Sequence, residues 1–165
     1  QPLTRAGIAI IVHPQTPLSE ISLGLLQEIY RGRVQEWEGA VLAVVSREAG
    51  SGTRAAFDGT VLQGRDITLT AVVMPSSEAV IAYVAQTPGS LGYVSTLRLN
   101  ASEASGVRVL PVEGVSPTAA AIESGDYALT HQVYIATVGE PTGKTRELAQ
   151  WILSPAGRRI VQDTP

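Results

Sequence analysis

Short aliphatic runs alternate with segments of helical spacing, and this alternation restricts the fold more than any other feature of the chain. The first runs are residues 7–12 (GIAIIV) and 41–46 (VLAVVS), with leucine, isoleucine and tyrosine recurring at helical spacing between them. Strands that alternate with helices predict an α/β fold in which helices cover a sheet. The 165 residues, 44% of them apolar, are enough for a single domain spanning 1–165 with a proper core.

The same pattern continues to the end of the chain. Further strands are expected at residues 67–73, 91–96, 107–112 and 132–138. Helices are expected from residue 19 to Gly32, from the residues after Thr53 to about Gly64, after the capping pair Ser76 and Ser77, over 116–125, and over 145–163. The last of these contains Ser154 and Pro155, which predict a break between two helices.

The stretch VVSREAGSGTRAAF, residues 44–57, joins the second aliphatic run to the next helix through a polar elbow. In open α/β sheets, ligands collect at the carboxyl ends of strands, where such loops lie. A helix that starts near Ser51 leaves its first amides without intrahelical partners, and these amides carry partial positive charge. Gly50 and Gly52 let a bound group approach the backbone, and Ser51 and Thr53 add hydroxyl donors. The elbow therefore predicts an oxyanion site.

Two arginines flank the elbow. Arg47 ends the expected strand and can offer a planar fork of donors to an oxyanion. Arg54 lies in the first helical turn, where a cation opposes the helix dipole unless an anion is bound nearby. The alternative is an ordinary loop with a serine N-cap, in which Arg47 pairs with Glu48. The residues alone leave both interpretations open.

Several other chemistries are disfavoured. The segment 138–145 (VGEPTGKT) has one residue too few between its glycines for a phosphate-binding P-loop. Ala49 breaks the glycine pattern of a serine nucleophile elbow around Ser51. His13 and His131 are expected to be surface or hinge residues, and with no cysteine in the chain no metal site is expected. The sequence therefore predicts neither an enzyme nor a cofactor.

The charge pattern argues against nucleic acid as a partner. The net charge is −3, and lysine and arginine are scattered singly rather than gathered in a basic stripe. A protein that binds a small anion at one site needs no such stripe.

Taken together, residues 7–37, 44–57, 76–95 and 131–161 resemble the periplasmic phosphate-binding proteins of ABC transporters, the PstS family. The motif REAGSGTR, residues 47–54, is the most specific part of the resemblance, which covers nearly the whole chain. It implies a lobe of the type II periplasmic-binding-protein fold, with a mixed sheet layered by helices. It also implies non-catalytic binding of phosphate, delivery to an ABC permease, and a periplasmic or extracellular location, secreted or membrane-anchored.

By this resemblance, Arg47, Ser51, Gly52 and Thr53 would contact the phosphate. Ala49 occupies the place of an aspartate with which some family members recognise protonated phosphate, so the choice between phosphate and sulfate stays open. Members of the family also have a further N-terminal stretch that supplies half of the first lobe. In this sequence, only six residues precede the first aliphatic run, which starts at residue 7. We therefore expect an incomplete first lobe and an open half-site with affinity of roughly millimolar strength.

The alternatives keep the scaffold and change its role. The groove could take another oxyanion, or the domain could be a sensor or protein-interaction module with weak anion binding. A surface left uncovered by the missing segment would be apolar and could support self-association.

Overall fold

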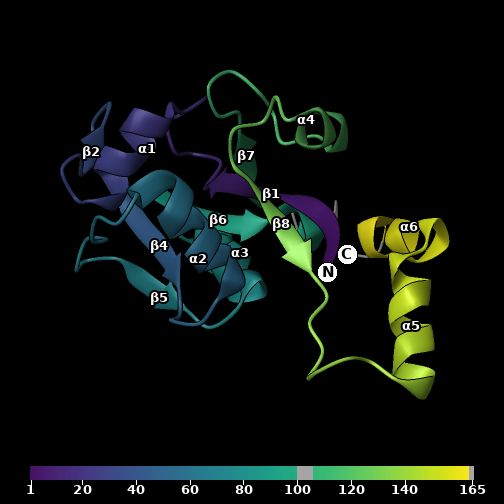
Figure 1. The fold of residues 1–165 in the computed structure, drawn as a ribbon. Helices are drawn as coiled ribbons and strands as arrows, with labels where there is room; N and C mark the ends of the chain where they lie inside the picture. Colours follow the sequence, from purple (N-terminus) through teal and green to yellow (C-terminus); the bar gives the residue numbers. More distant parts are fainter. Residues whose placement is uncertain (100–105, 164–165) are drawn as a thin grey trace.

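In the computed structural model, which describes residues 1–99 and 106–163, a mixed sheet forms the centre of the molecule (Figure 1). Its strands are β1 (Pro2–Val12), β4 (Ala43–Arg47), β5 (Val72–Met74), β6 (Ser90–Ser95), β7 (Arg108–Leu110) and β8 (Thr130–Tyr134). They lie in the order β5-β4-β6-β1-β7, and β8 also pairs with β1. β4 is parallel to β5 and β6, whereas β1 is antiparallel to β6, β7 and β8. The expected mixed α/β sheet is confirmed.

Helices follow most of the strands, as the alternation of the sequence predicts. They are α1 (Leu23–Tyr30), α2 (Gly52–Phe57), α3 (Ser77–Gln86), α4 (Ala119–Ser124), α5 (Gly143–Leu153) and α6 (Pro155–Asp163). Helix α2 runs directly into the π-helical turn η1 (Asp58–Leu62), and a short 3-10 helix, η2 (Thr96–Arg98), follows β6. A small hairpin of β2 (Glu36–Trp37) and β3 (Ala40–Val41) connects α1 to β4.

Strand β1 is buried on both faces, which explains its unbroken aliphatic sequence. Ile8 and Ile10 pack into a core with Leu26 and Tyr30 of α1 and with the end of α2. Ala9 and Ile11 point to the other face of β1 and belong to a second core, which they share with the apolar residues of α3. Side chains alternate across a strand, so successive residues of this run serve two helical layers.

Several boundaries differ from those that the sequence predicts. β1 begins at Pro2 rather than at residue 7, because its first half pairs with β8. The strand expected at 67–73 is reduced to β5, and the one expected at 132–138 is shifted toward its N-terminal side as β8. Residues 145–163 do form two helices, and Ser154 separates them.

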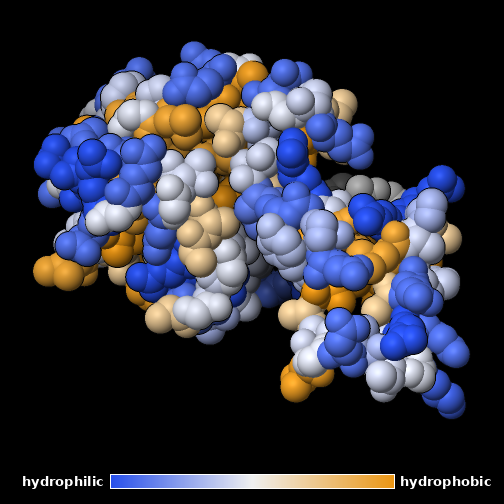
Figure 2. Space-filling view, viewed as in Figure 1, coloured by the Kyte–Doolittle hydropathy of each residue, from blue (hydrophilic) through white to orange (hydrophobic). Residues whose placement is uncertain are grey.

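Helix α5 stands apart from the sheet, whereas α6 lies beside the N-terminal end of β1 (Figure 1). No residue of α5 is buried, and Leu148, Trp151 and Ile160 expose about half of their surface. Figure 2 shows hydrophobic residues gathered over this pair of helices. In the described ranges, no helix is both long and apolar enough to cross a membrane.

Candidate anion-binding groove

The elbow between β4 and α2 is built by local backbone chemistry. Arg47 ends β4, and Gly50 has φ of +95°, a left-handed conformation that glycine adopts at little cost. Ser51 is the N-cap of α2, and its Oγ accepts a hydrogen bond from the Arg54 amide at 3.3 Å. The first helical amides, those of Gly52 and Thr53, have no preceding turn to bond to and remain available as donors.

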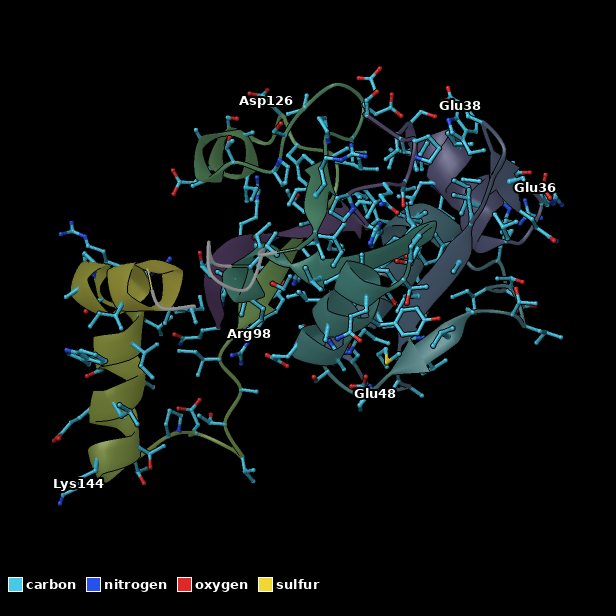
Figure 3. All side chains as sticks on the ribbon, turned by 180° about the vertical axis from the view of Figure 1, so that it is seen from behind. Glu36, Glu38, Glu48, Arg98, Asp126 and Lys144 are labelled. Atoms are coloured by element: carbon cyan, nitrogen blue, oxygen red, sulfur yellow. The ribbon has the colours of Figure 1, made fainter. Side chains whose placement is uncertain are left out.

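A groove of about 560 Å³ runs along the edge of the sheet at which β4 and β6 end. Four segments line the groove. They are the elbow, the start of α3, the short helix η2, and strand β8. The lining residues of the groove are Arg47, Ser51, Gly52, Thr53, Ser76, Ser77, Glu78, Ser95, Leu97, Arg98, His131, Gln132 and Val133. In Figure 3, Glu48 and Arg98 are labelled at the lower edge of the main body, with Arg98 on the side nearer α5.

The Arg47 guanidinium is held in place from two directions. Its Nε and Nη2 donate to the two carboxylate oxygens of Glu48, at 2.8 and 2.9 Å, and its Nη1 donates to Ser77 Oγ at 3.0 Å. Only 11% of the Arg47 side chain is exposed. The hydrogen bonds from Arg47 are the main cause that lowers the pKa of Glu48. The expected alternative, an Arg47–Glu48 pair, is thus present, and the guanidinium still lines the groove.

This pairing leaves part of the guanidinium free. Glu48 takes the side formed by Nε and Nη2, and Ser77 takes one hydrogen of Nη1, which accounts for three of the five N–H donors. Within residues 1–99 and 106–163, one hydrogen of Nη1 and one of Nη2 have no acceptor. Ser77 Oγ accepts from Arg47, so its own hydroxyl proton is also free to donate.

Two of the six residues predicted from the sequence do not line this groove. Gly50 and Arg54 line an adjoining depression beside Asp58, which Ser51 and Gly52 also border. Arg54 Nη1 donates to the Arg47 carbonyl at 2.9 Å, and its Nε donates to Asp58 Oδ2 at 3.4 Å. The charge of Arg54 at the start of α2 is therefore balanced by a carboxylate one turn later, with no need for a bound anion. The structure brings Arg47, Ser51, Gly52 and Thr53 together in the groove.

Most of the groove residues that lie outside the elbow were not predicted from the sequence as ligand contacts. Ser76 and Ser77 were expected only as helix caps, and Ser76 does cap α3 through the Ala79 amide. Arg98 and His131 had no local pattern that marked them. His131, expected to be a surface or hinge residue, lies within β8 and is half-buried, and burial lowers its pKa. Only the pairing of β8 with β1 brings it to the groove.

The fold and the groove define an α/β domain with an open polar groove at the carboxyl ends of two parallel strands. A family model described as a PBP superfamily domain matches residues 1–156. The chain belongs to the PBP superfamily.

Named relatives agree with this assignment. The chain is 29% identical over 153 residues to the phosphate-binding protein PstS of Bacillus subtilis (strain 168), covering 90% of this chain and 50% of that protein. It is 33% identical over 129 residues to phosphate-binding protein PstS 2 of Streptococcus agalactiae serotype V, covering 72% of this chain and 43% of that protein.

A solved structure extends the similarity to three dimensions. It is a putative phosphate ABC transporter substrate-binding protein from Clostridium perfringens with bound phosphate, which is 27% identical in sequence with a TM-score of 0.84. The match covers 97% of this chain and 67% of that one.

These findings confirm the resemblance to phosphate-binding proteins and the fold expected from it. The relatives are named as binding proteins, which agrees with the expectation that the chain is not an enzyme. The chain spans about half the length of the curated relatives it matches.

Proposed function

We propose that this domain binds inorganic phosphate or a related oxyanion, without chemistry, as part of the solute-binding component of an ABC phosphate transport system. Such a component works in the periplasm or outside the cell and delivers its ligand to a membrane permease. The observation that carries the proposal is the nearly buried Arg47 guanidinium, fixed by Glu48 and Ser77 beside the free amides of the elbow.

The proposed contacts follow from the donors that the groove leaves free. The remaining N–H groups of Arg47 Nη1 and Nη2 would bind two oxygens of a tetrahedral ion, as charge-assisted hydrogen bonds. The amides of Gly52 and Thr53 and the hydroxyls of Ser51 and Thr53 would bind the others. Ser51 Oγ accepts from the Arg54 amide, so its hydroxyl hydrogen is free to point at the ligand.

We further propose that residues 1–165 act as one ligand-binding domain with an incomplete first lobe. The greater length of the relatives supports this proposal, because they contain about as much chain again. A groove open to water on one side weakens each hydrogen bond to the ligand. The domain alone should therefore bind phosphate in roughly the millimolar range.

Isothermal titration of the 165-residue chain with phosphate tests the proposal. Arg47→Ala should weaken binding by about tenfold or more, the equivalent of one charge-assisted hydrogen bond. Arg33→Ala is the matched control, because Arg33 is exposed and pairs only with Glu28 in the described structure. Unchanged binding by the Arg47 variant would refute the site, and sub-micromolar binding by the domain alone would refute the incomplete lobe. Competition with sulfate decides which oxyanion is preferred.

A second role is supported by a separate observation. Leu148, Trp151 and Ile160 present apolar surface on α5 and α6, as an interaction module would. Light scattering across a range of protein concentrations tests self-association through this surface, and a strict monomer would argue against it.

A further inference from the structure

His131 on β8 contributes a ring nitrogen that the contacts described so far do not use. Its Nδ1 is buried and has no hydrogen-bond partner in the described part of the chain. Its neighbour across the strand pair is Ala6 of β1, which offers no polar side chain. The ring also lines the groove that contains Arg47 and the elbow.

The buried nitrogen indicates how the ring carries its proton. A buried N–H without an acceptor costs the desolvation of a donor, so Nδ1 is better left unprotonated in the neutral ring. The single proton then lies on Nε2. Because Nδ1 is enclosed and His131 is a lining residue of the groove, we infer that Nε2 is the ring nitrogen that offers an N–H donor to a ligand there.

We propose that His131 is a further ligand-binding residue, donating from Nε2 to the bound oxyanion on the wall formed by β8, and that its protonation tightens binding at acid pH. The inference rests on the proposed function, because it needs an anion in the groove. The charged imidazolium carries its second proton on the enclosed Nδ1, which burial disfavours in the free and in the bound protein alike, whereas the anion favours the charged form in the bound protein only. Binding should therefore raise the pKa of His131, and by linkage the affinity rises as the pH falls.

The two carboxylates around the groove do not titrate between pH 5.5 and 7.5. The pKa of Glu48 is lowered chiefly by hydrogen bonds from Arg47, and that of Glu78 chiefly by a hydrogen bond from its own backbone amide and by Ser76. Both carboxylates stay ionised across this range. The remaining charged side chains nearby are the guanidinium groups of Arg47 on β4, Arg98 on η2 and Arg5 on β1. A change in affinity over this interval, beyond the ionisation of the ligand itself, reports on His131.

NMR of the imidazole rings tests the inference directly on the unmodified chain. The chain has two histidines, and His13→Gln assigns their signals. Saturating phosphate should raise the pKa of His131 by about one unit, as expected for a counter-charge within a few ångströms, and leave the chemical shifts of the His13 ring unchanged. His13 is the matched control because it lies outside the groove, with its Nδ1 accepting from the Gln15 amide.

Isothermal titration adds a second measurement. His131→Gln keeps a neutral donor but cannot gain a charge, so it should bind phosphate within about twofold of the unmodified chain at pH 7.5 and more weakly at pH 5.5, by up to about the tenfold that a one-unit shift in pKa allows. Taking the ratio of the two proteins at each pH cancels the ionisation of phosphate itself.

The outcomes separate this inference from the function on which it rests. If Arg47→Ala weakens binding while the His131 pKa and the affinity ratio stay constant, the role of His131 is refuted and the groove stands. If phosphate binds no better to the unmodified chain than to Arg47→Ala, both are refuted.

Discussion

Ser77 links two elements at the groove through one hydroxyl group. It is the first residue of α3, is nearly buried, and accepts from Arg47 Nη1 at 3.0 Å. Its hydroxyl therefore does two things at once, because it fixes the guanidinium and keeps a proton for a ligand.

Ser77→Ala should weaken phosphate binding by about threefold to tenfold, the effect of losing one or two neutral hydrogen bonds. Stability should fall by about 1 kcal/mol or less, because Glu48 still holds Arg47. Titration calorimetry and urea unfolding measure the two effects. Ser124→Ala, on exposed α4, is the control, and equal affinities of the two variants would rule out this role for Ser77.

Three buried tyrosines make the protein sensitive to alkali. Burial is the main cause that raises the pKa values of Tyr30, Tyr93 and Tyr127. An acid whose pKa is raised in the folded state stabilises the fold below its unfolded pKa, about 10, and loses that contribution as the pH rises further. Stability should be nearly flat from pH 7 to 9 and fall above pH ~10.

Tyr127→Phe should separate the two contributions of that residue. Below pH 9 the variant loses the hydrogen bond from Tyr127 Oη to the Ile8 carbonyl, about 1 kcal/mol, and above pH ~10 its stability should fall less steeply. Urea unfolding at several pH values measures both effects. Tyr134→Phe, at an exposed tyrosine, should match the unmodified chain, and parallel pH curves for all three proteins would contradict the prediction.

Helix α3 reaches its place because β6 has a glycine beneath it. A Cβ on Gly92 would lie 2.8 Å from Val80 Cγ1 and 3.2 Å from Val84 Cγ2, so the bare backbone lets the helix lie close to the sheet. The first residues of α3 line the groove, and the packing of Gly92 therefore also sets the position of Ser77.

Gly92→Ala should destabilise the protein by about 1–3 kcal/mol, because α3 must move outward. Phosphate binding should weaken with it. Gly24→Ala is the matched control at an exposed position of α1, where nothing lies within 4 Å of the new methyl group, and it should stabilise by about 0.5–1 kcal/mol. Unfolding curves of the two variants test this contrast. Similar stabilities would contradict the prediction, because they would show that α3 accommodates a methyl group at position 92 without loss of stability.

Strands with strong local signals could be predicted, and those defined by distant partners could not. The run at 7–12 is aliphatic and was expected, but Pro2 to Ala6 became strand only because β8 lies beside them. The same applies to the groove. Arg47 and Ser51 share one motif, whereas Arg98 and His131 arrive from segments about 50 and 80 residues later, and nothing in their own neighbourhoods indicates a ligand.

The molecule consists of a well-packed domain around the sheet and a pair of helices, α5 and α6, that bury less of their surface. Most residues of β1 are buried, whereas no residue of α5 is, and α5 packs mainly against α6. Stability within a protein follows such differences in burial, so the two parts should open with different free energies.

Hydrogen exchange should show this difference. The amides of α5 should exchange through local opening at a free energy well below that of global unfolding, whereas those of β1 should require global unfolding. Helix α3 is the control, since it has nearly the same length but packs on the sheet. Equal protection of α3 and α5 would mean that α5 is supported by contacts absent from this arrangement.

The central position of β1 has a consequence for biosynthesis. Strand β1 is synthesised before its neighbours β6, β7 and β8, which lie within residues 90–134, so this sheet cannot close until residue 134 has been made. Pairings so distant in sequence also form slowly. The nascent polypeptide therefore lacks a closed sheet until these late strands have been made, and its aliphatic first strand stays available to other binding partners, such as a chaperone, for that time.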